Sequence, residues 1–441
     1  MFILIAGAGT VGYMLAKVLS YRHNVVIIDK NLEKLNKIAE DLDVLTIHGD
    51  IENPQTYKEL DITKAHLYIA VTNSDEANLL STLVAEDEIA IDSKIVRLKN
   101  DSFATSAVLK KLDINYAVFP NLITANKIEA LLNFPKANNV KHFSQTHFEL
   151  ISIKVDYSHK HHYLIKDILE ENVMAVGVER KKIFTITDDE FLLEQDDLLY
   201  LFGDSKKIAK IADTLNQTLP NKIKRVVIFG ANELSQKIAK RLLFNNIELK
   251  IIEKDKSLCK EALEYLNGQA TIINASYNEH SFFEEEGVSS ADMVIATFDN
   301  DEKNIVKCIE AKEYGVAKVV ALNNDKDYYE LMHMLGVIVV RGTKAAAYYS
   351  ILENISSSLI VTQRHYCGGK AILFMRKIYA NSPFIGKSTS KLKVAHAKVL
   401  LIRNNTISPL EKSTFLEEGD IIVLFGLSEY KEELEKWIYE L

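Results

Sequence analysis

The chain is an internal duplication, and this repeat constrains its fold more than any other feature of the sequence. Segments of the first half recur in the same order in the second half, each displaced by about 224 residues. The paired segments are Phe2–Gly9 with Val226–Asn232, Val25–Asp29 with Leu249–Glu253, Ala70–Asn78 with Ala296–Asn304, and Asp197–Gly203 with Asp420–Gly426. Because a single offset relates all the pairs, each half is predicted to be one copy of a two-domain unit.

In the first part of each half, short apolar runs alternate with longer stretches of helical character. Phe2–Ala6 and Asn24–Ile28 are strand-like, and Val11–Ser20 and Asn31–Leu42 are helix-like. Further strands are predicted at Val44–Ile47, Leu67–Val71, Lys94–Leu98 and Tyr116–Phe119. This alternation predicts an α/β fold, namely a Rossmann-like, doubly wound parallel sheet with helices on both faces.

The pattern changes after Phe134–Pro135. The elements predicted beyond it are strands at Phe148–Val155, Met174–Glu179 and Leu198–Phe202, and helices at Leu164–Glu171 and Lys206–Leu215. Together they predict a small α+β domain of about 80 residues at the end of each half. The predicted boundaries are 1–138 and 222–359 for the two Rossmann-like domains, and 139–221 and 360–441 for the two small domains.

A glycine-rich turn between the first strand and the first helix predicts a dinucleotide site. Gly7 permits a tight turn, Gly9 lets the backbone approach a pyrophosphate, and Gly12 lets helix and strand pack closely. The helix N-terminus adds free N–H groups and a partial positive charge. Asp29 ends the second strand, where a carboxylate accepts both ribose hydroxyls and repels a 2′-phosphate. NAD(H) is therefore favoured over NADP(H).

Other strand ends supply further candidates for the same site. Asp50 and Thr72 follow the third and fourth strands and are expected on the adenosine side, since carboxyl ends of parallel strands face the ligand. Helix capping by Asn73 or Asp75 is the alternative reading of the segment after the fourth strand. Arg97 ends the fifth strand and is a candidate phosphate ligand, with a surface ion pair as its alternative.

The second copy departs from this pattern. Asn232 and Ser235 replace the second and third glycines, Ser276 replaces Asp50, and Ala321 replaces Arg97. An asparagine side chain would crowd a pyrophosphate, although Glu253 still offers a carboxylate for a ribose. The second site is expected to be weak, altered or without a nucleotide.

Composition narrows the class of protein. Hydrophobic residues make up 47% and charged residues 26%, as in a folded globular chain, and the net charge of −8 argues against a nucleic-acid partner. The N-terminus lacks the features of a signal peptide. No apolar run reaches the roughly 18 to 20 residues that spanning a bilayer demands, so any membrane role is expected to be peripheral.

No cluster of residues predicts catalysis or a metal. Nucleophile, metalloprotease and P-loop motifs are missing from the sequence, and the three cysteines show no zinc-type spacing. His159, His161 and His162 are expected to lie in a solvated loop rather than to bind a metal. The acidic run from Asp188 to Asp197 is expected to be a solvated face.

The glycine turn, Asp29, the segment Ala70–Asn78 and Ile95–Arg97 resemble the N-lobe of RCK (KTN) domains. The small domains, with Ser382–Ser388 and Glu418–Asp420, resemble the RCK C-lobe, so the likeness covers the whole chain as a tandem. The family's nucleotide motif falls on Gly7, Gly9, Gly12, Asp29, Asp50, Thr72 and Arg97.

The resemblance implies a regulator rather than an enzyme. Such a protein binds NAD(H) and adenine nucleotides (ATP or ADP), and assembles into a ring-like homo-oligomer, a dimer or a tetramer. It docks from the cytoplasm, on the inner face of the plasma membrane, onto a TrkH-type potassium-transporting membrane protein. The alternatives are an NAD-dependent oxidoreductase with one inactive copy, and a scaffold in which the nucleotide is purely structural.

Overall fold

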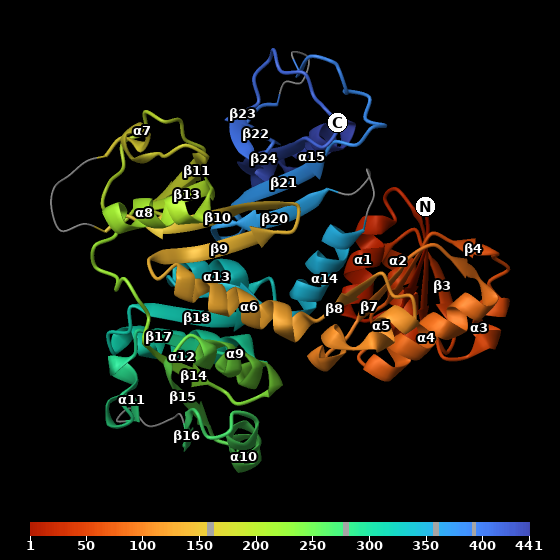
Figure 1. Cartoon of the computed structure of the whole chain (residues 1–441), viewed down its shortest axis with the longest axis horizontal. Helices are drawn as coiled ribbons and strands as arrows, with labels where there is room; N and C mark the ends of the chain where they lie inside the picture. The colour runs from red at the N-terminus through yellow and green to blue at the C-terminus, as the bar shows by residue number, and fades with distance from the viewer. Residues whose placement is uncertain (157–162, 277–281, 356–360, 390–393) are drawn as a thin grey trace. The chain divides into compact units, whose positions relative to one another are not determined.

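The computed structural model describes residues 1–156, 163–276, 282–355, 361–389 and 394–441 (Figure 1). The chain forms two compact units. The first comprises Met1–Thr124 and Gly342–Ser356, and the second comprises Ala125–Arg341 and Ser357–Leu441. His159, His161 and His162 lie outside the described residues. Among the described helices, none is both long enough and apolar enough to cross a membrane.

A parallel six-stranded sheet forms the centre of the first unit, in the order β3-β2-β1-β5-β7-β8. Its strands are β1 (Phe2–Ala6), β2 (Asn24–Asp29), β3 (Leu45–His48), β5 (Leu67–Ala70), β7 (Lys94–Arg97) and β8 (Tyr116–Val118). The helices are α1 (Thr10–Leu19), α2 (Leu32–Asp41), α3 (Pro54–Lys58), α4 (Asp75–Glu88) and α5 (Ala107–Lys111), and the short strands β4 (Lys64–Ala65) and β6 (Ala90–Ile91) pair separately. The strand order reverses between β1 and β5, which is where doubly wound sheets bind ligands.

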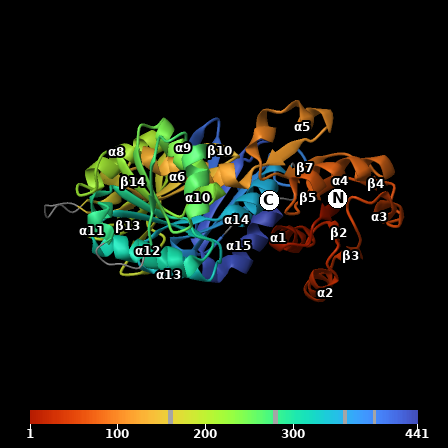
Figure 2. The same cartoon turned by 90° about the horizontal axis from the view of Figure 1, so that it is seen from below.

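The second unit contains a sheet of the same topology, β16-β15-β14-β17-β18-β19. Its strands are β14 (Arg225–Phe229), β15 (Glu248–Glu253), β16 (Thr271–Asn274), β17 (Met293–Ala296), β18 (Lys318–Asn323) and β19 (Ile338–Arg341). Its helices are α9 (Glu233–Phe244), α10 (Lys256–Tyr265), α11 (Phe282–Glu285), α12 (Asp301–Glu313) and α13 (Tyr328–Met334). Figure 2 shows α9 and α12 on opposite faces of this sheet. The prediction of two doubly wound sheets is confirmed.

Two antiparallel sheets of the second unit also repeat one topology, β9-β10-β13-β11-β12 and β20-β21-β24-β22-β23. The first has β9 (Ala137–Phe143), β10 (Thr146–Lys154), β11 (Val173–Arg180), β12 (Ile183–Thr185) and β13 (Leu198–Gly203), with α7 (Ile165–Ile168) and α8 (Ser205–Leu215). The second has β20 (Thr362–Tyr366), β21 (Ala371–Lys377), β22 (Ala397–Arg403), β23 (Thr406–Pro409) and β24 (Ile421–Leu427), with η3 (Cys367–Gly369), η5 (Ser428–Tyr430) and α15 (Lys431–Glu440). Side chains of both sheets, among them Phe202 and Phe425, share one apolar core.

An arginine–aspartate pair is repeated in these two sheets and corrects one expectation. Arg180 donates through Nε and Nη2 to the carboxylate of Asp197, at 2.8 and 2.7 Å, and Arg403 binds Asp420 at the same distances. Asp197 is 1% exposed, because the guanidinium neutralises it inside the protein. The acidic run is therefore not wholly a solvated face, since its last member is a buried structural ion.

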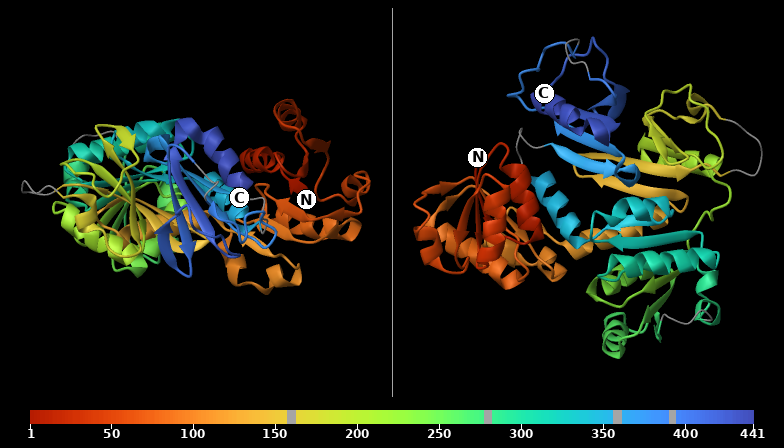
Figure 3. Two further views of the ribbon diagram at one scale, coloured as in Figure 1. Left: turned by 90° about the horizontal axis from the view of Figure 1, so that it is seen from above. Right: turned by 180° about the vertical axis from the view of Figure 1, so that it is seen from behind.

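The two units exchange the helices that follow their parallel sheets. α6 (Pro120–Asn133) follows β8, yet its residues Ala125, Ile128 and Leu131 belong to the core of the second parallel sheet. α14 (Thr343–Asn354) follows β19 but belongs to the first unit, where it lies beside α1 (Figures 1 and 3). There the hydroxyls of Ser350 and Tyr116 are 3.1 Å apart. The four domain boundaries drawn from the sequence stay predictions.

Candidate functional site

The turn from β1 into α1 has the shape that a diphosphate requires. Gly7 has φ +111°, and a Cβ there would lie 3.1 Å from the backbone nitrogen of Thr72. A Cβ at Gly12 would overlap the carbonyl oxygen of Gly7, so the first turn of α1 packs directly on the loop. Gly9 precedes α1 without a side-chain cap, and a Cβ there would meet nothing within 4 Å. The free N–H groups of α1 therefore border open space.

Asp29 ties this turn to the end of β2. Its Oδ2 accepts a hydrogen bond from the backbone N–H of Ala8 at 2.6 Å, and its Oδ1 accepts one from Asn31 at 2.8 Å. A carboxylate has about four acceptor positions, so these two donors leave capacity for hydroxyl groups. The structure thus brings the predicted carboxylate next to the predicted phosphate turn.

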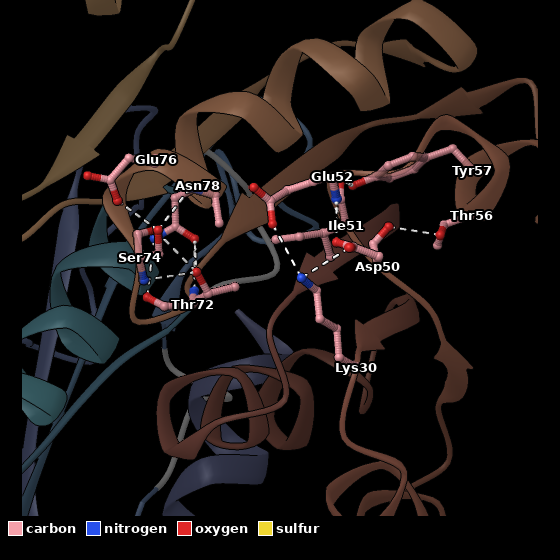
Figure 4. Close-up of polar contacts among 11 residues, drawn as sticks. Lys30, Asp50, Ile51, Glu52, Thr56, Tyr57, Thr72, Ser74, Glu76 and Asn78 are labelled. Carbon is pink, nitrogen blue, oxygen red and sulfur yellow. Dashed lines mark hydrogen bonds and ion pairs between the residues drawn. The ribbon is translucent and has the colours of Figure 1, made fainter.

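Asp50 follows β3, which ends at His48, and is held by a lysine that the sequence reasoning missed. Lys30 Nζ lies 3.0 Å from Asp50 Oδ2 and 3.4 Å from Glu52 Oε2. Figure 4 shows the lysine reaching toward both carboxylates. Partial burial opposes ionisation, but the N–H of Glu52 and the ammonium of Lys30 hold the pKa of Asp50 below its ordinary value. The signal available in the sequence was the position of Lys30 directly after Asp29.

Thr72 is engaged in a network within the loop after β5. Its backbone N–H and its hydroxyl both donate to Oδ1 of Asn78, at 2.9 and 2.7 Å (Figure 4). The helix cap predicted at Asn73 or Asp75 is instead Ser74, whose hydroxyl accepts from the N–H of Ala77. The Thr72 side chain therefore shapes the loop beside Gly7, and its methyl group faces that glycine.

Arg97 lies inside the protein rather than on an exposed strand end. It is 8% exposed and donates through Nη1 to the carbonyl of Thr72 at 2.9 Å and to Oδ1 of Asn73 at 3.1 Å. Burial lowers the pKa of its guanidinium, which the charge of Asp75 partly offsets. Its alternative as a surface ion pair is wrong, because the side chain is buried under the loop that it supports.

Asn78 and its counterpart in the repeat form a structural element that the sequence reasoning did not single out. Asn78 Nδ2 donates to the carbonyl of Arg97 at 2.7 Å, and Asn304 Nδ2 donates to the carbonyl of Leu322 at 2.8 Å. In each copy the amide links the loop after the fourth core strand to the end of the fifth. The retention of asparagine in both halves was the signal that would have identified it.

In the second copy, side chains occupy the equivalent turn. Asn232 accepts from the N–H of Ser235 at 3.0 Å and donates to the carbonyl of Thr297 at 2.8 Å. The hydroxyls of Ser235 and Thr297 are 2.7 Å apart. Glu253 keeps the role of Asp29 toward the backbone, since it accepts from the N–H of Ala231 at 3.1 Å, but it is only 5% exposed. Side chains of the protein itself therefore cap the N-terminus of α9.

The chain is similar to known proteins along its whole length. The model of the TrkA-N domain matches residues 3–120 and 226–341, one match to each parallel sheet. A "Trk system potassium uptake protein TrkA homolog" of Archaeoglobus fulgidus is 26% identical over 442 residues, which covers 99% of each chain. The "Trk system potassium uptake protein TrkA" of Halomonas elongata is 23% identical over 439 residues, which covers 96% of this chain and 95% of the relative.

Solved structures share the fold along the whole chain. The GsuK RCK domain superposes with a TM-score of 0.59 at 18% identity and covers 99% of this chain and 94% of that one. The GsuK channel bound to NAD gives 0.60 at 17% identity, covering 99% and 78%. These relatives and neighbours are named as potassium uptake proteins and channels rather than enzymes. Since the family model matches more than half of the sequence, once in each repeat, the chain belongs to the TrkA-N domain family.

Proposed function

We propose that this chain is the regulatory subunit of a Trk-type potassium uptake system and that its first Rossmann-like domain senses NAD(H). Whole-length similarity to Trk potassium uptake proteins supports the regulatory role. The open turn at Gly9, backed by the Asp29 carboxylate, is the observation that carries the nucleotide assignment.

In the proposed complex the pyrophosphate lies over Gly7, Gly9 and Gly12 and accepts hydrogen bonds from the N-terminus of α1. Asp29 accepts hydrogen bonds from the ribose hydroxyls. Asp50 and Thr72 border the same edge of the sheet, on the adenosine side. Arg97 acts indirectly, by fixing the loop that carries Thr72.

ATP and ADP are proposed as competing ligands of the same turn, because they share the adenosine and diphosphate groups that this edge recognises. One solved GsuK structure is named as bound to NAD and another as bound to ADP. In this chain, competition between nucleotides would report the energy state of the cell to the transporter. The carboxylate of Asp29 disfavours NADPH, since it would repel a 2′-phosphate.

Gating follows from differential affinity. A nucleotide shifts the balance between two conformations only by the difference in its affinity for them, and each tenfold difference supplies about 1.4 kcal/mol. The proposed partner is a TrkH-type potassium-transporting membrane protein. The proposed assembly is a ring-like homo-oligomer attached to the inner face of the plasma membrane.

Replacement of Gly9 by glutamate tests the nucleotide site. A Cβ at Gly9 meets nothing within 4 Å, so Gly9→Glu should fold normally. Its carboxylate would lie where the diphosphate binds and should lower NADH affinity at least about a hundredfold. Isothermal titration calorimetry of the full chain measures this. Unchanged NADH affinity in the variant would refute the site.

The matched control is Tyr21→Glu. Tyr21 is 76% exposed, just beyond the other end of α1, and the substitution adds the same charge away from the turn. NADH affinity should stay within about twofold of the unsubstituted chain. A comparable loss in both variants would mean that net charge, and not the turn, governs binding.

The partner is tested by co-purification with a TrkH-type membrane protein, with NADH, with ATP and without nucleotide. The proposal expects a complex whose stability depends on which nucleotide is present. A chain that never associates with the membrane protein, under any of the three conditions, would refute the regulatory assignment while leaving the nucleotide site standing.

A further inference from the structure

Three side chains of different chemistry converge in the second unit. They are Glu179 at the end of β11, His333 in α13 and Cys367 at the start of η3. One ligand atom from each lies within 4.8 Å of the others, and His333 Nε2 is 2.7 Å from Glu179 Oε2. A carboxylate oxygen, an imidazole nitrogen and a thiol sulfur are together a donor set that suits zinc.

The backbone of η3 is shaped to bring these groups together. Cys367, Gly368 and Gly369 have φ values of +51°, +63° and +95°. A Cβ at Gly368 would lie 2.8 Å from Cδ2 of His333, so only glycine lets the imidazole approach this closely. A left-handed cysteine is uncommon, and here it directs the thiol toward the histidine and the glutamate.

The surroundings of Glu179 match those of a metal-binding carboxylate. The side chain is 9% exposed, and Lys370 Nζ lies 2.8 Å from Oε1, leaving Oε2 on the side of His333. Burial disfavours its charge, yet hydrogen bonds from His333 and Lys370 bring the pKa of Glu179 to about 2, so the carboxylate is ionised. A lysine on the second oxygen orients a monodentate ligand, as outer partners commonly do.

A cavity beside the cluster provides the remaining coordination position. It has a volume of about 170 Å³, and Glu179, His333 and Cys367 all line it. The buried hydroxyl of Tyr366 lines the same cavity and has no hydrogen-bond partner among the described residues. A catalytic or exchangeable zinc site characteristically combines three protein ligands with a water, and this cavity has room for one.

We propose that Glu179, His333 and Cys367 bind one Zn²⁺ ion, with water from the cavity as its fourth ligand. Binding breaks the S–H bond of Cys367 and the N–H bond by which His333 Nε2 contacts Glu179, and it forms one S–Zn and one N–Zn bond. The thiol proton passes to solvent and the imidazole takes its proton on Nδ1 instead, so the imidazole stays neutral and no electrons are transferred. A cysteine binds zinc as the thiolate, so coordination itself displaces the proton of Cys367. Carboxylate and thiolate together neutralise the ion.

The consequence is a cross-link within the second unit. Its ligands come from β11 of the first antiparallel sheet, from α13, which precedes β19 of the second parallel sheet, and from η3, which connects β20 and β21 of the second antiparallel sheet. Zinc would therefore stabilise the arrangement of these three sheets, by RT ln(1 + [Zn]/Kd) when the ion does not bind the unfolded chain. This site is separate from the proposed nucleotide turn, which belongs to the first unit.

Cobalt tests the assignment on the unsubstituted protein. The full chain, freed of metal with a chelator, is titrated with Co²⁺ and then with Zn²⁺ while absorbance is recorded. The proposal expects one equivalent of Co²⁺, a near-ultraviolet thiolate-to-cobalt band, and loss of that band when Zn²⁺ displaces cobalt. Saturable binding without a thiolate band, or no saturable binding, would overturn it.

Substitutions then identify which cysteine supplies the sulfur ligand. Cys367→Ser should abolish the thiolate band and weaken zinc binding at least about a hundredfold, whereas Cys259→Ser should change neither. If Cys367→Ser fails to fold, Glu179→Gln provides the second test, because it should weaken zinc binding while retaining the thiol. Zinc affinity that is unchanged in either of these two folded variants would refute the site.

Discussion

The side-chain amide of Asn232 donates a hydrogen bond to the carbonyl of Thr297, 2.8 Å away, across the mouth of the second glycine-type turn. Its oxygen at the same time caps α9 through the N–H of Ser235. The chain thus supplies from within the hydrogen bonds that a phosphate would make. In the first turn, the corresponding position is Gly9, which has no side chain.

This difference predicts one nucleotide per chain. Calorimetric titration of the full chain with NADH should give a stoichiometry near one. Removing the internal cap in the double variant Asn232→Gly/Ser235→Gly should create a weaker second site, because Glu253 and the N-terminus of α9 remain in place. Two equivalent sites in the unsubstituted chain would contradict the prediction.

Gly12 and Gly9 should respond oppositely to alanine. A Cβ at Gly12 would overlap the carbonyl oxygen of Gly7, so Gly12→Ala should destabilise the first unit by about 3 kcal/mol. Gly9→Ala adds a methyl group to open space and should change stability by less than about 1 kcal/mol. Urea denaturation of both variants measures the contrast, and equal effects would show that Gly12 is not a packing constraint.

The repeated arginine–aspartate pair should contribute equally to the free energy of unfolding in both copies. Arg180→Ala leaves Asp197, 1% exposed, without a counter-charge, and Arg403→Ala does the same to Asp420, 2% exposed. Each should cost about 3–5 kcal/mol of unfolding free energy.

The control is Lys166→Ala, which removes a pair with Glu190 whose side chains are 46% and 68% exposed. Such a pair is expected to contribute no more than about 1 kcal/mol. Denaturant unfolding measures the free energy of unfolding of the three variants and so ranks their losses of stability. If the two arginine variants lose as little unfolding free energy as the lysine variant, water must reach the buried aspartates.

The lowered pKa of Lys141 predicts that the free energy of unfolding rises with pH. Burial, with the nearby charges of Arg364, Lys127 and Arg341, lowers its pKa to about 7. The unfolded chain, with an ordinary lysine pKa near about 10.4, holds more protons across this window. The free-energy cost of burying the charged lysine is therefore fully present below about pH 7 and disappears as the pH rises toward about 10.4.

Lys141→Met should raise the thermal midpoint at pH 7 and flatten its increase between pH 7 and 10. Lys37→Met, at an exposed position, should leave the slope unchanged. An unaltered slope in the Lys141 variant would show that this ammonium is stabilised by an anion or by solvent.

The parallel sheets and the glycine turn were predictable because their signals are local. An apolar run such as Val25–Ile28 is buried on both faces of a parallel sheet, so it stands out without alternation. By contrast, β9 (Ala137–Phe143) was missed, since most of its residues are polar and only partly buried. The helix predicted at Leu164–Glu171 shrinks to α7, because the chain becomes extended at Leu169.

The side-chain contacts of the two sites were less accessible to sequence reasoning. The residues around Gly9 lie close together in the chain or repeat in the second half, which revealed them. Glu179 and His333 are 154 positions apart, and Cys367 lies in a third element, η3, so no spacing could indicate that they meet. Likewise, a strand-end arginine looks the same in sequence whether it faces solvent or, like Arg97, supports a loop from inside.

The exchanged helices make the repeat indivisible. A chain ended at residue 221 would lose α14, whose Ala346, Ala347 and Ile351 are buried in the first unit. The remaining half would in turn lose Ala125, Ile128 and Leu131 of α6 from the core around its parallel sheet. Although the sequence is a doubling, neither copy is self-sufficient, and expression of either half by itself should give an aggregation-prone product.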